Sequence, residues 1–171
     1  MNPMSDTLLD ADLAARWAAP LADALRARGW RLAAAESCTG GLLAAACTAL
    51  AGSSDWFERG FVTYSNQAKR EQLGVPAALL EAHGAVSEPV ARAMAEGALA
   101  RSRADLALAV TGIAGPGGEV PGKPVGTVWI AIARRGAATT AEHLLIGGDR
   151  AAVRARTVEI ALERLRQASA C

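Results

Sequence analysis

The chain has 171 residues, enough for one domain with its own hydrophobic core. Its formal net charge is +1, with acids and bases spread along the sequence, so no basic surface or tail predicts a nucleic-acid or anionic-membrane partner. Three cysteines without metal-ligand spacing and only two histidines offer little for a metal site or a Ser-His-Asp triad. We expect a cytoplasmic protein without a metal or cofactor that acts on a small molecule, because neither a signal peptide nor a membrane-spanning run is evident.

Alternating helical and strand patterns follow an N-terminal stretch. Residues 1–12 are expected to be poorly ordered, and residues 13–168 to form a single domain. In chain order, the patterns predict a helix over 13–28, a strand over 30–35, a helix over 42–51, a strand over 56–64, helices over 66–73 and 76–84, a longer helix capped by Ser87, a strand over 106–110, paired strands over 125–133 and 139–146, and a helix capped by Asp149 that runs to about 167. This order predicts an α/β fold, a three-layer α/β/α domain with a mixed β-sheet.

Three of the predicted strands end in turns that carry polar or glycine residues. These turns follow Ala35, Tyr64 and Val110. In open α/β sheets, ligands bind outside the carboxyl ends of the strands. The three turns are therefore expected to converge on one pocket.

The turn Glu36–Gly41 (ESCTGG) joins a strand to a helix and places a serine where the helix begins. Unpaired amides and the helix dipole favour negative charge at such a point. The amides of Thr39, Gly40 and Gly41 are the expected oxyanion donors. The simpler interpretation is that Ser37 or Thr39 caps the helix and the glycines permit a tight turn.

A lysine and a tyrosine complete a possible acyl-transfer site. Among 18 basic residues only Lys69 and Lys123 are lysine, and a desolvated lysine can act as a general base where arginine cannot. Lys69 is expected to activate Ser37, with Tyr64 relaying the proton or donating to the developing charge. Thr111 lies in the glycine-rich turn. A solvated lysine and a core-capping tyrosine are the alternatives.

Other chemistries have less support. The sequence lacks a G-x-S-x-G elbow, a Walker A loop and a G-x-G-x-x-G turn, so hydride transfer and nucleotide triphosphate hydrolysis are not predicted. Cys38 is a rival nucleophile that we interpret as a packing residue. Glu36 is either the buried partner of a cation or part of the ligand site. His83 and His143 are interpreted as structural.

Phosphate recognition has its own candidates. Gly112 and Gly115 belong to a glycine-rich turn whose amides can face a phosphate, and Lys123 follows that turn. Arg150 lies in the first turn of the last helix, where a cation is unfavourable against the helix dipole, which indicates a use for it. Arg154 is interpreted as part of a solvated helix face.

Five runs of residues, in order, resemble the C-terminal domain of the competence/damage-inducible protein CinA. They are Glu36–Gly41 (ESCTGG), Val62–Asn66 (VTYSN) with Lys69, Gly84–Glu88 (GAVSE), Val110–Gly118 (VTGIAGPGG) and Lys123–Gly126 (KPVG). The resemblance extends over residues 12–167. Ala51 stands where the family pattern leads us to expect proline, a departure that affects only a loop.

Stand-alone members of that family are the nicotinamide-nucleotide amidases (PncC), and the resemblance implies their reaction. That reaction hydrolyses the carboxamide of nicotinamide mononucleotide to nicotinate mononucleotide and ammonia in pyridine nucleotide salvage, without a metal. It implies catalytic roles for Ser37, Tyr64, Lys69 and Thr111. The longer family members carry a further N-terminal domain, so a pyrophosphatase activity housed there is not expected.

Two other functions remain open. The same pocket can serve a non-catalytic module that binds a pyridine nucleotide or phosphate ester, linked to a competence or damage response. A direct role in DNA uptake or repair is the weaker alternative, because the charge is near neutral. Apolar faces in an alanine-rich domain also predict a homo-oligomer.

Overall fold

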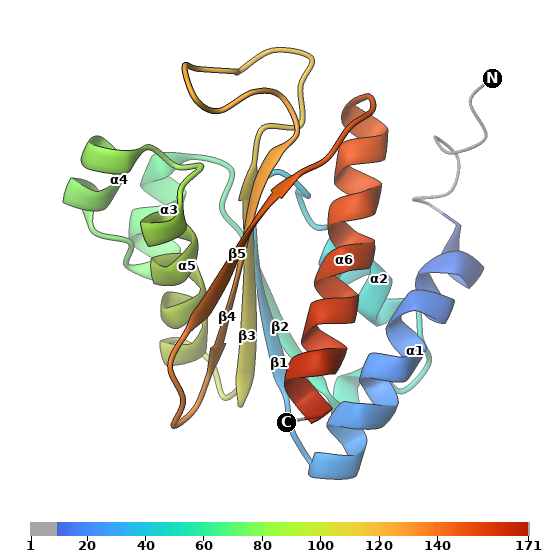
Figure 1. Cartoon of the computed structure of the whole chain (residues 1–171). Helices are drawn as coiled ribbons and strands as arrows, with labels where there is room; N and C mark the ends of the chain where they lie inside the picture. Colours follow the sequence, from blue (N-terminus) through green and yellow to red (C-terminus); the bar gives the residue numbers. More distant parts are fainter. Residues whose placement is uncertain (1–9, 171) are drawn as a thin grey trace.

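Five strands form one mixed sheet that helices cover on both faces (Figure 1). The structure is a computed structural model, and it describes residues 10–170. The strand order is β2-β1-β3-β4-β5; β1 pairs in parallel with β2 and β3, whereas β3–β4 and β4–β5 are antiparallel. The strands are β1 (Leu32–Glu36), β2 (Phe57–Val62), β3 (Leu106–Gly112), β4 (Thr127–Arg134) and β5 (Thr140–Leu145). The predicted three-layer α/β/α fold with a mixed sheet is confirmed.

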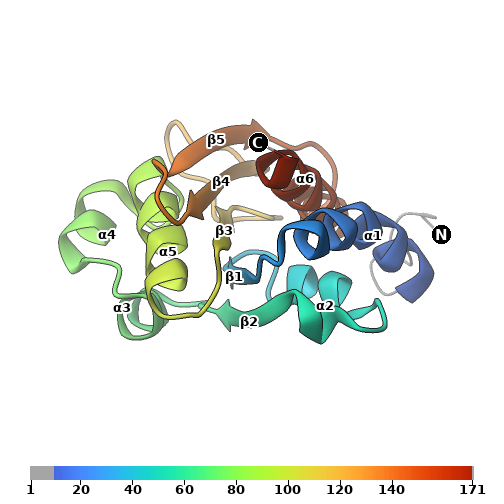
Figure 2. The same ribbon diagram turned by 90° about the horizontal axis from the view of Figure 1, so that it is seen from below.

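The helices divide between the two faces (Figure 2). They are α1 (Ala11–Arg28), α2 (Leu42–Thr48), the short 3-10 helix η1 (Ser53–Asp55), α3 (Asn66–Leu73), α4 (Ala77–His83), α5 (Glu88–Ala100) and α6 (Arg150–Ala170). One face packs against α1, α2 and α6 through larger side chains such as Leu32 and Leu108. The other face lies under α5 and consists largely of alanine, including Ala33 and Ala107. Side chains alternate between the faces of a strand, so β1 and β3 supply both cores.

Some element boundaries differ from the sequence-based expectation. Helix α1 begins at Ala11, two residues before the expected start, because the Asp10 carboxylate accepts bonds from the amides of Asp12 and Leu13. Residues 1–9 lie outside the described residues. Helix α2 ends at Thr48 rather than residue 51, and β2 covers 57–62 rather than 56–64.

The two predicted helix caps have different outcomes. Asp149 caps α6, as predicted, because its Oδ1 accepts a bond of 2.9 Å from the Ala152 amide. Ser87 directly precedes α5, but its hydroxyl donates to the carbonyl of Gly84 and caps no amide of the helix. Ser87 is therefore the N-cap residue of α5, as predicted, but its side chain makes no capping bond.

Parallel pairing brings the carboxyl ends of β1, β2 and β3 to the same edge of the sheet. Helix α6 begins at that edge too, at the top of Figure 1. Segments far apart in sequence therefore meet above the sheet. Within residues 10–170, no helix is long and apolar enough to span a membrane.

The packing of α3 against α5 depends on Gly97. A Cβ at this position would lie 2.0 Å from the carbonyl oxygen of Leu73, the last residue of α3. In a helix, alanine is more favourable than glycine by about 1 kcal/mol of stability. Overpacking lowers stability by about 1–3 kcal/mol, and a clash with a backbone atom lies at the upper end of that range. We expect Gly97→Ala to lower the free energy of unfolding in chemical denaturation. Gly147→Ala, where a Cβ has open space, is the matched control; an equal or higher stability of Gly97→Ala would contradict the contact.

Candidate active site

Ser37 and Lys69 meet at the carboxyl edge of the sheet. Ser37 directly follows β1, and its amide donates to the carbonyl of Val110 on the neighbouring strand (3.0 Å). Lys69 lies on α3, and its Nζ donates to Ser37 Oγ (3.0 Å) and to the carbonyl of Thr63 (2.7 Å). The two residues are 32 positions apart in sequence. The predicted convergence of the turns therefore brings the serine and the lysine into direct contact.

The Lys69 amine is almost completely buried. The residue is 2% exposed, and both hydrogen-bond partners of its Nζ are uncharged oxygens. Burial disfavours the charged form of an amine and lowers the pKa of Lys69 below its usual value. The alternative of a solvated lysine is therefore wrong. A neutral amine beside a serine hydroxyl can accept its proton.

Glu36 holds the turn that carries Ser37. It is fully buried, and its Oε2 accepts bonds from the Thr39 hydroxyl (2.6 Å) and the amides of Gly41 and Leu43 (3.0 Å each). Its Oε1 accepts a bond of 2.9 Å from the amide of Ala44. The carboxylate thus satisfies amides that begin α2. Among the described residues, Glu36 forms no ion pair with a cation, and its bonds go to these amides and one hydroxyl. A role in the ligand site stays a prediction.

The three predicted oxyanion amides are occupied or buried. The amide of Gly40 donates to the carbonyl of Ser37 (3.0 Å), and that of Gly41 donates to Glu36. Thr39 is fully buried, so its amide does not face solvent. The structure therefore does not offer these amides to a substrate. The simpler interpretation is wrong about the cap, because Gly41 and neither Ser37 nor Thr39 occupies the N-cap position of α2. Its second part is confirmed, since Gly40 and Gly41 have φ of 59° and 105°, values that glycine adopts readily in a tight turn.

Tyr64 and Arg150 form a second group beside the serine turn. Tyr64 is 60% exposed, and its hydroxyl accepts a bond of 2.7 Å from Nη2 of Arg150. Nη1 of Arg150 donates to the carbonyl of Gly115 (2.9 Å). A Cβ built on Gly40 would lie 3.9 Å from the Tyr64 ring. The tyrosine, the arginine and the glycine-rich loop therefore meet next to the turn.

Arg154 contacts the serine turn directly. Its Nε donates to the carbonyl of Cys38 (3.1 Å) and its Nη2 to the carbonyl of Thr39 (3.2 Å). The interpretation of Arg154 as a solvated residue is therefore wrong. The only sequence signal for this contact is that Arg154 lies four residues after Arg150, on the same side of α6.

Three predicted site residues contact the scaffold. Thr111 is fully buried, and its hydroxyl donates to the carbonyl of Ala85 (2.9 Å). Lys123 Nζ donates to the carbonyl of His83 at the end of α4 (2.6 Å). A Cβ at Gly112 would lie 2.8 Å from a Val128 methyl carbon, so this glycine permits close packing. The side-chain bonds of Thr111 and Lys123 therefore join the site to other loops, and their roles toward a substrate stay predictions.

Cys38 is a buried packing residue, in agreement with the sequence-based interpretation. Burial raises the pKa of its thiol to about 11, so the nucleophilic thiolate is disfavoured. His143 lies on β5 with its ring centroid 5.0 Å from that of Trp129. Within residues 10–170, no group of three His, Cys, Asp or Glu side chains is placed to hold a metal ion.

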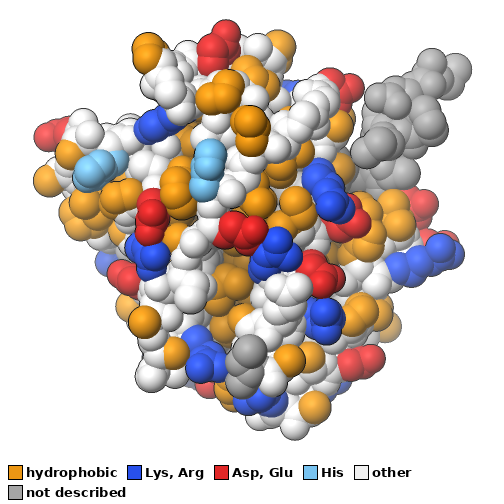
Figure 3. Space-filling model, viewed as in Figure 1, with side chains coloured by type: hydrophobic (Ala, Val, Ile, Leu, Met, Phe, Trp, Pro, Cys, Tyr) orange, Lys and Arg blue, Asp and Glu red, His pale blue; other side chains and the backbone are white. Residues whose placement is uncertain are grey.

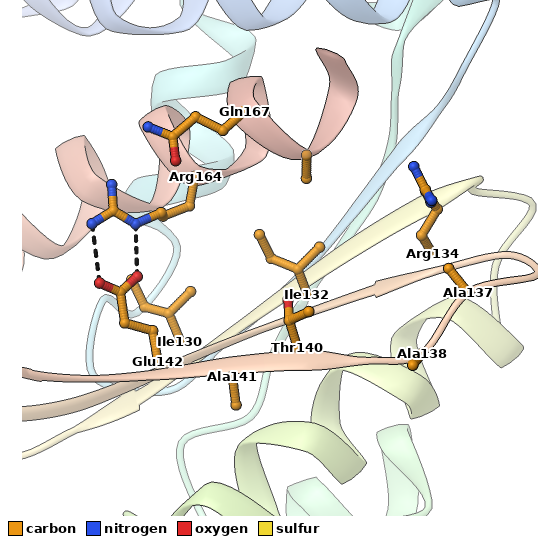
Figure 4. Close-up of a pocket in the computed structure, with 11 residues that line it drawn as sticks. Ile130, Ile132, Arg134, Ala137, Ala138, Thr140, Ala141, Glu142, Arg164 and Gln167 are labelled. Atoms are coloured by element: carbon orange, nitrogen blue, oxygen red, sulfur yellow. Dashed lines mark hydrogen bonds and ion pairs between the residues drawn. The ribbon is translucent and has the colours of Figure 1, made fainter. Parts of the chain in front are cut away.

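Two surface features lie apart from this site. A groove of about 460 Å³ runs between the β4–β5 hairpin and the end of α6, where Arg164 pairs with Glu142 (Figure 4). None of the predicted site residues lines it. On the face shown in Figure 3, acidic and basic side chains are interspersed. That face therefore shows no field of one sign that would attract a polyanion.

Residues 14–169 match the model of the CinA C-terminal domain. The chain belongs to the CinA C-terminal domain family. Two crystal structures of family members superimpose on it with a TM-score of 0.88. The competence/damage inducible protein CihA from Agrobacterium tumefaciens is 46% identical, covering 92% of this chain and 96% of that one. A CinA superfamily protein from Klebsiella pneumoniae is 43% identical, covering 92% and 98%.

Family members differ in length. The nicotinamide-nucleotide amidohydrolase PncC of Escherichia coli K12 is 53% identical over 144 residues, which cover 84% of this chain and 87% of PncC. A CinA-like protein of Mycolicibacterium vanbaalenii is 54% identical over 140 residues, which cover 82% of this chain and 33% of that protein. The chain spans 25–35% of the length of four longer relatives. It therefore corresponds to one part of those proteins and to most of PncC.

The hydrogen bonds of Glu36 predict that replacing it with glutamine, which has nearly the same size and shape, strongly destabilises the protein. In Glu36→Gln, a side-chain NH₂ group would face backbone amides that need an acceptor, and losing bonds to a buried charged group costs about 2–4 kcal/mol. We expect the free energy of unfolding to fall by that amount in chemical denaturation. Glu96→Gln, at an exposed position of α5, is the control and should change it by less than about 0.5 kcal/mol. Equal stabilities would show that the carboxylate does not hold the turn.

Proposed function

We propose that this protein hydrolyses the carboxamide of nicotinamide mononucleotide to nicotinate mononucleotide and ammonia, with Ser37 as nucleophile and Lys69 as general base. The observation that carries the proposal is the hydrogen bond of 3.0 Å between Lys69 Nζ and Ser37 Oγ, made by a lysine residue that is 2% exposed. The name of the E. coli relative PncC supports the same reaction, since the alignment covers 87% of that protein.

The reaction follows the logic of serine acyl transfer. The neutral Lys69 amine takes the proton of the Ser37 hydroxyl as Oγ attacks the carboxamide carbon, forming a tetrahedral intermediate. The C–N bond then breaks while Lys69 returns the proton to the departing nitrogen, which leaves as ammonia. Water next attacks the acyl ester while Lys69 takes its proton, and Lys69 returns that proton to Ser37 Oγ as the ester bond breaks. Nicotinate mononucleotide is released and the free serine is restored. The Thr63 carbonyl holds the amine toward Ser37 throughout.

Tyr64 is proposed to donate a hydrogen bond to the reacting group. The Tyr64 hydroxyl oxygen accepts a bond from the Arg150 guanidinium, so the hydroxyl proton points away from Arg150. The positive charge of Arg150 also makes the Tyr64 O–H a stronger hydrogen-bond donor. Of the two roles open from the sequence, donation to developing charge fits this contact better than proton relay. Donors of this kind are needed because the amides of Gly40 and Gly41 are already bonded.

Arg150 is proposed to meet the substrate phosphate. Its guanidinium is exposed at the edge of the serine turn and already contacts the glycine-rich loop through Gly115. An arginine at the first residue of α6 opposes the helix dipole, and an anion beside it would relieve that opposition. Thr111 and Lys123 are proposed to support the site through their bonds to Ala85 and His83. The homo-oligomer and the cytoplasmic location stay predictions.

The nucleophile is tested by ammonia release from nicotinamide mononucleotide, measured with a chelator present. We expect the wild-type protein to release ammonia and Ser37→Ala to lose about four orders of magnitude in kcat, because a serine nucleophile has no substitute in the site. Ser54→Ala, at an exposed position, is the control and should retain full activity. Near-normal turnover by Ser37→Ala would overturn the assignment. Release by neither protein, with the nucleotide raising the Tm of both, would instead support the non-catalytic binding module.

The pH dependence tests Lys69. Because the depressed pKa makes the amine available as a base, kcat/KM should rise with pH along a limb whose midpoint lies below the ordinary lysine pKa of about 10.4. The unfolded chain binds the Lys69 proton more tightly than the folded protein does. Burial of Lys69 therefore lowers the stability at low pH, and this loss diminishes as pH rises toward the unfolded pKa.

Lys69→Met serves as the control for both effects. It should lack activity across the pH range, and the stability of the wild type relative to this variant should improve as pH rises. Chemical denaturation at several pH values measures the second effect. A difference in stability that is independent of pH between 7 and about 10 would contradict a depressed pKa.

A further inference from the structure

Arg154 reaches from the last helix to the turn that carries the proposed nucleophile. Its Nε and Nη2 bind the carbonyls of Cys38 and Thr39, which lie 116 and 115 residues earlier in the chain. A Cβ at Gly40 would lie 3.5 Å from Nη2, so the guanidinium packs directly against the turn. No sequence motif joins these segments, and the contact depends entirely on the fold.

Two side chains of opposite charge hold the turn. An acidic side chain binds hydrogen-bond donors of the turn, and a basic side chain binds its carbonyl groups. The Glu36 carboxylate binds the Thr39 hydroxyl and the Gly41 amide, whereas the Arg154 guanidinium binds the carbonyls of the turn. A peptide plane whose carbonyl is fixed has its N–H direction fixed as well. The two charged groups together leave the peptide planes from Cys38 to Gly41 little freedom to rotate.

The same bonds argue against Arg154 as a phosphate ligand. Nε and Nη2 form the side-on pair of donors with which arginine binds a phosphate or carboxylate through two bonds. In this structure both of these atoms already bind carbonyls. Arg150 is exposed, whereas Arg154 is half-buried, so the two arginines of α6 have different surroundings.

We infer that Arg154 is a positioning residue that, by binding the carbonyls of Cys38 and Thr39, keeps Ser37 Oγ within hydrogen-bond distance of Lys69 Nζ. This inference rests on the proposed function only in taking Ser37 as the nucleophile. It does not depend on which carboxamide is the substrate. Misplacement of a reacting group by about 1 Å can reduce a rate about 100-fold, which sets the size of the expected effect.

The test compares Arg154→Met and Arg154→Lys with Arg156→Met in the full chain. Arg156 is an exposed residue of the same helix, where it pairs with Glu159. Two quantities are measured: kcat and KM for nicotinamide mononucleotide, and the rate at which a fluorophosphonate labels Ser37, followed by mass spectrometry. The labelling reaction requires an activated serine but no nucleotide, so it separates the position of the nucleophile from the identity of the substrate.

We expect Arg154→Met to lower kcat and the labelling rate by about 100-fold with KM changed less than about threefold. Arg154→Lys should recover part of both rates, because an ammonium can bind a carbonyl but lacks the planar fork. Arg156→Met should match the wild type. A large rise in KM with unchanged kcat and labelling would assign Arg154 to phosphate binding and overturn the inference. A lower Tm with both rates unchanged would reduce Arg154 to a structural role and also overturn it.

Failure of the proposed function gives a different pattern. If the wild type releases no ammonia from the nucleotide but Ser37 is labelled, the substrate assignment fails, and the labelling rates of the Arg154 variants alone decide the inference. If Ser37 of the wild type is not labelled and no ammonia is released, the activated serine is absent and both proposals are overturned.

Discussion

The buried carboxylate of Glu36 is the group on which the serine turn depends. An ionised carboxylate inside a protein is tolerated only when hydrogen bonds replace its hydration. Here one hydroxyl and three amides do so, all from the turn and the first residues of α2. Because those amides are occupied, this helix N-terminus is not open to a ligand anion. Recognition of negative charge is left to side chains around the turn, of which Tyr64 and Arg150 are the exposed pair.

The position of Lys69 joins this turn to the other helical layer. Its helix, α3, packs on α5 through the close approach of Leu73 and Gly97, and Nη1 of Arg101 also donates to the carbonyl of Leu73 (2.9 Å). Burial of an amine destabilises its charged form, so this placement opposes stability while it favours a neutral base. Residues that lower stability in this way frequently belong to functional sites.

Patterns local in sequence were sufficient to predict the framework. Periodicity identified the strands and helices, and the carboxyl-end rule for parallel strands brought together Ser37, Lys69 and Tyr64.

Contacts that depend on tertiary geometry were not predictable in this way. The sequence left two roles open for Glu36, as the partner of a cation or as part of the ligand site, and only the folded turn brings four donors to it. Nothing in the local sequence distinguishes Arg154 from a solvated residue of the helix, because the carbonyls that it binds lie more than 100 residues earlier in the chain. Thr111 belongs to a site motif, yet its hydroxyl bonds to the backbone of another loop.

Helix α6 supplies Arg150 and Arg154, whereas Ser37 and Lys69 come from the first half of the sequence. During synthesis on a ribosome, the serine turn and α3 therefore leave the exit tunnel well before the arginines that contact the turn and Tyr64. A nascent or prematurely terminated chain that stops before α6 has the serine and the lysine but neither guanidinium. The complete constellation thus forms only when α6 has been translated and packed against the sheet, so incomplete products do not carry it.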